Sequence, residues 1–318
     1  MSERVVAPRG GSSSPALPAR IAIPAPPVPA APPLAAGSVA RPSRWRAFVF
    51  DWSINVLLLV GGLLMLVPFV WAFSTSFRLG RESFTLPPQW FPTDWRISNY
   101  QEVLDSLPFF RFVFNSFKVA GLITLIQIVT CSTAAFAFAR LRFRGRDALF
   151  FLFLSSLMVP QYVTIIPIFV IIRRLELLNS HWALILPSAF SAFGIFLLRQ
   201  YFLTVPRDLE DAARIDGAGF FEIYWRIMMP LVAPALVTLT IFSFNYHWNE
   251  FFRPLIFLST WEQMTLPLGL TILRGYLGTG NTAAVMAGVT MALAPVLLVF
   301  LLFQRYLIEG ITLTGLKE

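Results

Sequence analysis

Long apolar runs alternate with short polar segments along most of the chain. Six of these runs are predicted to be helices that cross a membrane, because about 20 residues at ~1.5 Å each span a hydrocarbon core of ~30 Å. The runs cover residues 54–73, 119–138, 148–171, 182–201, 231–252 and 284–303. The pattern therefore predicts an all-α, polytopic membrane protein whose transmembrane domain covers residues 46–318.

The first 45 residues do not share this pattern. Ala, Pro, Gly and Ser dominate them, and residues 1–40 contain no aromatic side chain. Such a segment cannot bury enough apolar surface to offset its loss of conformational entropy, so we expect a disordered tail. Prolines interrupt any apolar core within it, which argues against a signal peptide.

A polar segment, residues 203–230, separates the fourth and fifth runs. Its central part, residues 209–231, reads LEDAARIDGAGFFEIYWRIMMPL. Acidic residues crowd the opening turn, where carboxylates complement the positive end of a helix. Pro206 just before them suits a first helical position, because its missing N–H would have no partner there. We therefore expect a short helix outside the bilayer.

Two glycines are expected to end this short helix. Gly217 and Gly219 can take a positive φ without steric cost, so both suit the corner that follows a helix. A second, aromatic-rich helical run follows until Pro230, which opens the next apolar segment. Two short helices around a glycine corner are typical of a docking surface.

Two of the predicted spans contain local departures from an apolar helix. Pro160 interrupts the helical hydrogen bonds of the third span next to Gln161, and such breaks are tolerated where the backbone lines a cavity. The alternative for Gln161 is packing against a neighbouring helix. In the fourth span, the small residues of Ser191–Gly194 favour close approach of helices.

The fifth span contains a run of polar and aromatic side chains, NYHWNEFF at residues 245–252. Such groups are costly at membrane depth unless they face a cavity or one another. Aromatic rings beside amide groups also suit sugars, which have an apolar ring face and many hydroxyls. The alternative is an interfacial aromatic belt anchored by Glu250. The residues predicted to line a translocation pathway are Gln161, Asn245, Tyr246, Trp248 and Asn249.

Composition supports the membrane assignment. The chain is 56% hydrophobic and 13% charged, whereas soluble domains are about 25% charged. Basic residues flanking the spans explain the net charge of +8, so no nucleic-acid partner is expected. These residues are more numerous on the side that holds both termini and residues 203–230, which predicts that this side is cytoplasmic.

Several kinds of chemistry are missing from the sequence. It contains no GxxxxGK[ST] nucleotide loop, so the chain is not expected to hydrolyse ATP. His181 and His247 lack further ligands at metal-binding spacing, and the one cysteine, Cys131, lies in an apolar run. We therefore expect no catalytic residue, metal or bound cofactor.

The alternatives to a partner-driven pathway need features that the sequence lacks. An ion-coupled secondary transporter acting without an ATPase commonly uses a chain of intramembrane acids. A membrane-embedded enzyme needs a nucleophile, an acid pair or a metal set. The absence of these groups favours a translocation pathway whose energy comes from a partner.

At residues 211–218 (DAARIDGA) and 226–231 (RIMMPL) the chain resembles the EAA loop of permease subunits of binding-protein-dependent ABC importers. More narrowly, it resembles the second permease of the maltose-type carbohydrate importers. Supporting stretches are residues 184–201, 245–255, 265–269 and 304–316. The likeness extends from about Trp52 to the end of the chain.

The resemblance implies a type I importer permease fold in a bacterial plasma membrane. It also implies a second permease, two ATPase subunits that use ATP and magnesium, and an extracellular solute-binding protein. Sugars, oligosaccharides, polyols and glycerol phosphates all remain candidate solutes.

In that family the EAA loop is a coupling helix that docks into a cleft on the ATPase. Asp211 stands where the family usually has Glu, and Met229 where Leu is common; Glu210 could compensate for the shorter Asp211. The resemblance assigns to this contact Glu210, Asp211, Ala212, Ala213, Asp216, Gly217, Ala218 and Pro230.

Overall fold

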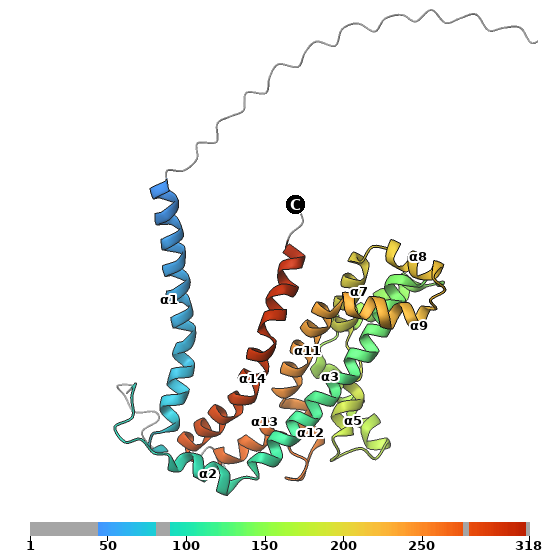
Figure 1. Cartoon of the computed structure of the whole chain (residues 1–318). Helices are drawn as coiled ribbons and strands as arrows, with labels where there is room; N and C mark the ends of the chain where they lie inside the picture. Colours follow the sequence, from blue (N-terminus) through green and yellow to red (C-terminus); the bar gives the residue numbers. More distant parts are fainter. Residues whose placement is uncertain (1–43, 81–89, 276–279, 316–318) are drawn as a thin grey trace, which may run out of the picture. The chain divides into compact units, whose positions relative to one another are not determined.

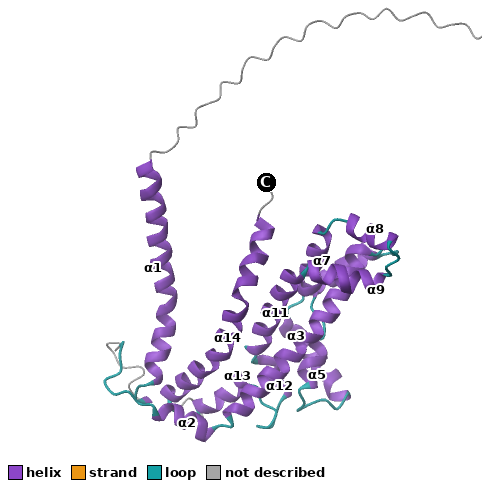
Figure 2. Cartoon of the chain, in the orientation of Figure 1, coloured by secondary structure: helices purple, strands orange, loops and turns teal. Residues whose placement is uncertain are grey.

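The computed structural model describes residues 44–80, 90–275 and 280–315, and within these ranges it contains helices and no strand (Figures 1 and 2). Contacts divide the chain into two units, Met1–Val60 and Gly61–Glu318. The predicted disordered tail lies outside the described residues except for its last two positions, so that prediction stays untested.

Helix α1 (Arg44–Ser76) contains the first predicted span and extends beyond it at both ends. Residues Trp52–Ser76 are apolar enough to cross a membrane. The helix is apolar on all sides, and side chains such as Leu57, Leu64 and Met65 are exposed on it. A helix of this kind suits contact with lipid or with another membrane chain.

Helix α3 (Phe109–Arg140) is the central element of the second unit, and half of its apolar window is buried. It packs against α7 (Ala192–Thr204) and α11 (Ala233–Trp248) (Figure 1). Helix α14 (Thr282–Gly315) packs in turn against α11. The core of this unit therefore lies around α3.

Polar side chains join α3 to other elements along its length. Asn115 donates to the carbonyls of Glu262 and Met264, both at 2.9 Å. Further along, Gln127 donates to the carbonyl of Ser188 at 2.8 Å. The helix is therefore fixed to the loop before α13 at one end and to the fourth span near its middle.

The remaining three predicted spans are bent pairs of helices. The segments Arg146–Met158 and Gln161–Arg174 meet at 102°, Trp182–Ser188 and Ala192–Thr204 at 41°, and Phe220–Leu231 and Ala233–Trp248 at 76°. The described residues thus give three unbroken candidate spans, or six if each pair crosses the membrane once. The largest bend follows the predicted break at Pro160, whose backbone has no N–H to donate.

The other elements are short. They are α2 (Ser98–Ser106), α4 (Arg146–Ser155), the 3₁₀ helix η2 (Ser156–Met158), α5 (Gln161–Arg174), α6 (Trp182–Ile185), η3 (Leu186–Ser188), α8 (Asp208–Ile215), α9 (Phe220–Glu222), the π-helix η4 (Ile223–Met228), α10 (Met229–Leu231), α12 (Phe252–Phe257), α13 (Leu266–Leu270) and η5 (Thr271–Arg274).

Helix α11 covers only part of the fifth predicted span. Helix α11 runs from Ala233 to Trp248, so Asn249 and Glu250 lie beyond it. At the other end, the helical path passes through Pro230 in α10 and bends at Val232 instead of starting a new helix at the proline. Pro230 has no N–H to donate to the preceding turn, and the path bends two residues after it, at Val232.

Candidate functional site

Helix α8 forms the first half of the segment 203–230 and begins later than the sequence suggests. Its first residue is Asp208, so Pro206 lies outside the helix. The glycine corner at Gly217 is confirmed, with φ of +86°. The N–H of Gly217 bonds to the carbonyl of Arg214 at 3.1 Å and that of Ala218 to the carbonyl of Ala213 at 2.9 Å. These two bonds form a Schellman motif, which satisfies the last carbonyls of the helix.

Gly219 does not share this role. Its φ is −77° and its ψ is 167°, which is extended backbone, and it precedes α9 as the N-cap. The expectation of a positive φ at Gly219 is therefore wrong. One residue in the left-handed region is enough for the Schellman motif, so the second glycine is not needed for the corner.

The two faces of α8 differ in exposure. Glu210 and Ala213 are buried, whereas the Asp211 side chain is 63% exposed. Ala212 and Asp216 are also exposed. Of the other predicted contact residues, Gly217 and Pro230 are exposed and Ala218 is half-buried.

The sequence reasoning missed Arg140, the residue that Glu210 faces. Nε of Arg140 lies 2.9 Å from Oε1 of Glu210, an ion pair in which the N–H does not point along a hydrogen bond. Nη2 of Arg140 donates to the carbonyls of Phe202 and Val205, the latter at 2.6 Å. No local sequence signal links Arg140 to Glu210, because one ends α3 and the other lies in α8.

The outer surface of the segment carries large apolar side chains. Ile215 is 86% exposed, and Phe220 and Phe221 are also exposed. The guanidinium of Arg214 lies over the Phe220 ring, 5.7 Å from its centre. Apolar side chains grouped at the end of α8 and the start of α9 mark a surface that suits another protein.

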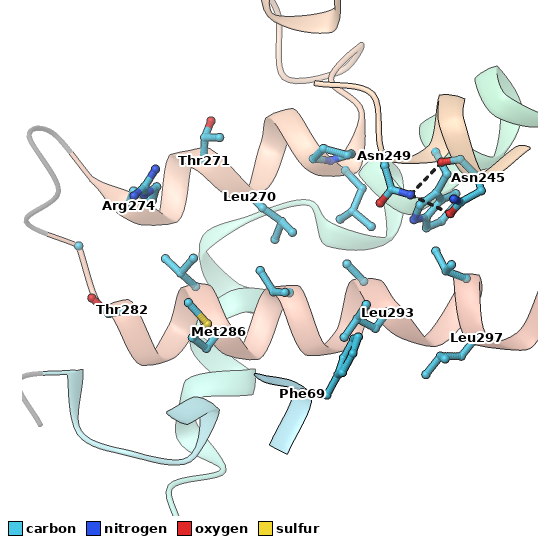
Figure 3. Close-up of a pocket in the computed structure, with 18 residues that line it drawn as sticks. Phe69, Asn245, Asn249, Leu270, Thr271, Arg274, Thr282, Met286, Leu293 and Leu297 are labelled. Carbon is cyan, nitrogen blue, oxygen red and sulfur yellow. Dashed lines mark hydrogen bonds between the residues drawn. The ribbon is translucent and has the colours of Figure 1, made fainter. Parts of the chain in front are cut away.

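The predicted pathway residues line two separate cavities on different sides of α11. A cavity of about 710 Å³ is lined by Gln161, Asn245 and Tyr246. A second cavity of about 800 Å³ is lined by Trp248, Asn249 and again Asn245 (Figure 3). Asn249 donates to Oδ1 of Asn245 at 3.0 Å, so the two amide side chains that line the second cavity are hydrogen-bonded to each other.

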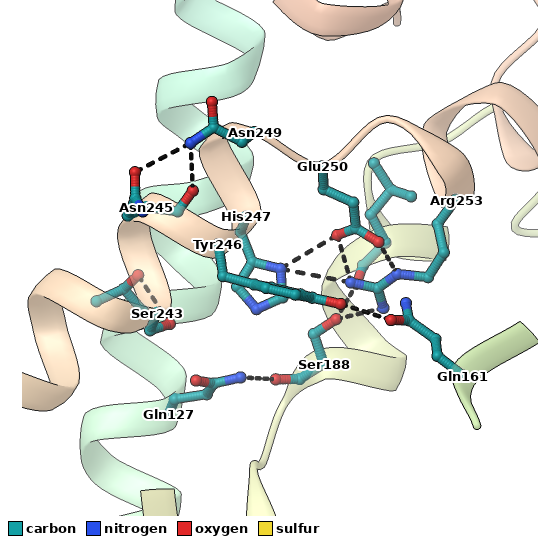
Figure 4. A network of polar contacts seen from close by, with 12 residues as sticks. Gln127, Gln161, Ser188, Ser243, Asn245, Tyr246, His247, Asn249, Glu250 and Arg253 are labelled. Carbon is teal, nitrogen blue, oxygen red and sulfur yellow. Dashed lines mark hydrogen bonds and ion pairs between the residues drawn. The ribbon is translucent and has the colours of Figure 1, made fainter. Parts of the chain in front are cut away.

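A buried charged cluster adjoins the first cavity and contains Glu250, the residue that anchors the aromatic belt in the alternative interpretation of this run. Glu250 bonds to Nε and Nη2 of Arg253, the latter at 2.5 Å, and contacts Nδ1 of His247 at 3.2 Å (Figure 4). Arg253 also donates to Oγ of Ser188 at 2.6 Å. Glu250 is therefore a buried ion-pair partner, and the belt alternative does not hold for it.

Within the described parts of the chain, no three His, Cys, Asp or Glu side chains gather as a metal site. His181 donates from Nε2 to the carbonyl of Gln263 at 2.9 Å. Burial lowers the pKa of His181, although that hydrogen bond opposes the change. This histidine therefore ties the start of α6 to the loop before α13.

The family model of the binding-protein-dependent transport system inner membrane component matches residues 128–312. The chain belongs to this family. The matched residues include the segment 203–230, the bent helix pairs that adjoin it, and the predicted pathway residues of α11.

The permease is similar to permease proteins of named transport systems. It is 34% identical over 263 residues to the sulfoquinovosyl glycerol transport system permease protein SmoH of Agrobacterium fabrum, covering 82% of this chain and 91% of that one. It is 38% identical over 209 residues to the arabinooligosaccharides transport system permease protein AraQ of Bacillus subtilis, covering 66% and 74%.

A solved structure has the same fold. It is a bacterial ABC transporter involved in the import of the acidic polysaccharide alginate, and its matched chain superimposes with a TM-score of 0.72 and 27% identity. The match covers 84% of the permease and 99% of the alginate transporter chain. The importer permease fold predicted from the EAA loop is thereby confirmed.

Proposed function

We propose that the permease forms half of the membrane pathway of an importer for a carbohydrate or related solute. A separate cytoplasmic ATPase drives it by docking on the segment 203–230. The exposed Ile215, Phe220 and Phe221 carry this proposal, because apolar side chains grouped at the end of α8 and the start of α9 mark a surface that suits a protein partner. The sequence contains no nucleotide loop, so ATP and magnesium belong to that partner.

The assembly includes a second permease, two ATPase subunits and an extracellular solute-binding protein, with both termini of this chain in the cytoplasm. Contacts along α3 put α8 and the loop before α13 at opposite ends of that helix. Glu210 of α8 lies at the Arg140 end of α3, whereas Glu262 and Met264 lie near the Phe109 end. If α8 is cytoplasmic, the loop before α13 faces the outside, where a solute-binding protein docks.

Co-purification tests the docking surface. Ile215→Asp places a charge on the apolar surface and should remove the ATPase from the purified complex. Ile97→Asp is the matched control, because Ile97 is 67% exposed before α2, toward the other end of α3. Equal ATPase content in wild type and Ile215→Asp would contradict the proposed surface.

The solute pathway uses the two cavities beside α11. Amide and hydroxyl groups from Gln161, Asn245 and Tyr246 face the smaller cavity, and such groups suit a hydroxyl-rich solute. The relatives that carry arabino-oligosaccharides and sulfoquinovosyl glycerol support the carbohydrate class. Sugars, oligosaccharides, polyols and glycerol phosphates remain the solutes to compare.

Uptake by the reconstituted complex tests this part. Proteoliposomes with the solute-binding protein and internal MgATP are offered labelled oligosaccharides, polyols and glycerol 3-phosphate in turn. Asn249→Ala and Gln161→Ala should raise the KM for the transported solute and leave ATPase binding intact. Transport by the permease pair without any ATPase subunit would instead support the ion-coupled alternative.

A further inference from the structure

We propose that Arg140 is a positioning residue that fixes the coupling helix α8 to the end of α3, so that both move as one body. The inference rests on the proposed function, in which an ATPase moves α8. In this proposal the buried Arg140 transmits the movement of α8 to α3.

The contacts of Arg140 join three elements. Its side chain starts from the last residue of α3, and its Nε lies 2.9 Å from Oε1 of Glu210 in α8. Its Nη2 donates to the carbonyls of Phe202 in α7 and Val205 just after it. The guanidinium is a planar group with donors in a fixed geometry, so it can hold all three partners at once.

Burial makes this joint strong. The side chains of Arg140 and Glu210 are 3% and 5% exposed. A buried charge that loses its partner is costly, so α8 cannot turn away from α3 without leaving the buried Arg140 guanidinium without its carboxylate. The other carboxylate oxygen of Glu210 lies 3.4 Å from Arg214 within α8 itself, so both oxygens of this acid face groups of its own chain.

A second contact holds the other half of the segment. Oη of Tyr224, in the π-helix η4, forms a hydrogen bond of 2.7 Å with Oγ of Ser132 in α3. Ser132 lies about two helical turns before Arg140. Two attachment points on one helix prevent the loop from rotating about either of them.

Helix α3 can carry the movement further. Beyond Ser132 it is bonded to the carbonyl of Ser188 through Gln127, and near its other end to Glu262 and Met264 through Asn115. A displacement applied at α8 therefore reaches the opposite side of the membrane domain through one helix. Without Arg140, α8 would pivot at the chain before it, and the displacement of α3 would be smaller.

Distance measurements between spin labels test this directly and need no solute. Labels are placed at Leu209→Cys in α8, outside the proposed docking surface, and Leu125→Cys in α3, with Cys131→Ser to remove the native thiol, in the full complex with its ATPase. Both label sites are exposed. The distance distribution is recorded without nucleotide and after trapping with MgATP and vanadate.

The wild-type joint should give one narrow distribution that is the same in both states. In Arg140→Gln the distribution should broaden, and its mean should shift on trapping. Arg140→Lys should lie between the two, because it keeps the charge but has no fork of donors. Arg144→Gln, an exposed arginine of the same turn, should match the wild type.

Two results would overturn the inference. One is a wild-type distance that itself shifts on trapping, and the other is an Arg140→Gln distribution as narrow and invariant as that of the wild type. Arg140→Lys supplies the same comparison if Arg140→Gln does not fold. Loss of the ATPase from the unlabelled wild-type complex would instead contradict the proposed function, so the two failures are distinguishable.

Discussion

The hydroxyl of Tyr246 donates a hydrogen bond of 2.5 Å to Oε1 of Gln161, and so joins α11 to the first residue of α5 (Figure 4). Gln161 directly follows the break at Pro160, where the backbone turns by 102°. Tyr246→Phe removes this bond and keeps the ring. Because a hydrogen bond contributes about 1 kcal/mol net, we expect the KM for uptake to change by roughly fivefold.

Uptake kinetics of the reconstituted complex measure this change. The matched control is Tyr162→Phe, which removes a hydroxyl from α5, the helix of Gln161, while keeping the ring contact with Phe252. Identical KM values for Tyr246→Phe and wild type would show that the bond does not position a solute-contacting group.

The ion pair between Glu250 and Arg253 should make a large contribution to stability. Both side chains are less than a tenth exposed, so Glu250→Ala leaves a buried guanidinium without its carboxylate. Removing one partner of a buried pair costs about 3–5 kcal/mol, and we expect the purified complex to unfold at a clearly lower temperature.

An exposed ion pair provides the control. Glu222→Ala removes the partner of Arg226, whose side chain is 75% exposed, and such surface pairs contribute about 0–1 kcal/mol. Thermal unfolding of the two variants should therefore differ strongly. Equal unfolding temperatures would contradict a stabilising role for the cluster around Arg253.

At Gly217 we expect the backbone conformation, and not the space for a side chain, to decide which substitutions preserve uptake. Nothing lies within 4 Å of a Cβ added there, but its φ of +86° disfavours any β-branched residue by at least about 1–2 kcal/mol. Gly217→Val should therefore reduce uptake strongly while the subunit stays in the membrane. Gly217→Asn should retain more activity, because asparagine tolerates the left-handed region.

Gly219→Ala is the matched control for Gly217. It adds a Cβ in equally open space, at a φ of −77° that any residue adopts. We expect normal uptake from this variant. If Gly217→Val showed full uptake in the same assay, a positive φ at residue 217 would not be required for transport.

Close packing of α7 on α3 depends on Gly194. A Cβ added there would lie 3.0 Å from Leu239 and 3.1 Å from Sγ of Cys131, so Gly194→Val should destabilise the protein by about 1–3 kcal/mol. Gly121→Val is the control, because a Cβ on Gly121 in α3 meets nothing within 4 Å. Thermal unfolding of the two purified variants, compared with wild type, measures the difference in stability. Similar losses of stability in both would show that the low helix propensity of valine, and not the packing at Gly194, causes the destabilisation.

Sequence reasoning found the features that depend on neighbouring residues. The break at Pro160 follows from a missing N–H, the corner at Gly217 from the conformational freedom of glycine, and the close packing at Ser191–Gly194 from small side chains. The sequence signal for each of these is local, although the packing at Gly194 also needs Leu239 and Cys131 from other helices. Ends of helices were less certain, as α11 and the helical path through Pro230 show, because packing decides where a continuous apolar segment bends.

The sequence by itself determined the membrane class, the candidate spans and the coupling segment, because hydrophobic runs and glycine corners are local properties of the chain. Only the tertiary structure decided that Glu210 turns inward to Arg140 while Asp211 faces outward. It also decided that the predicted pathway residues line two cavities beside α11, with Asn245 shared by both. Both results depend on which distant helices pack together, and residue spacing along one helix carries no information about the partner that a given face meets.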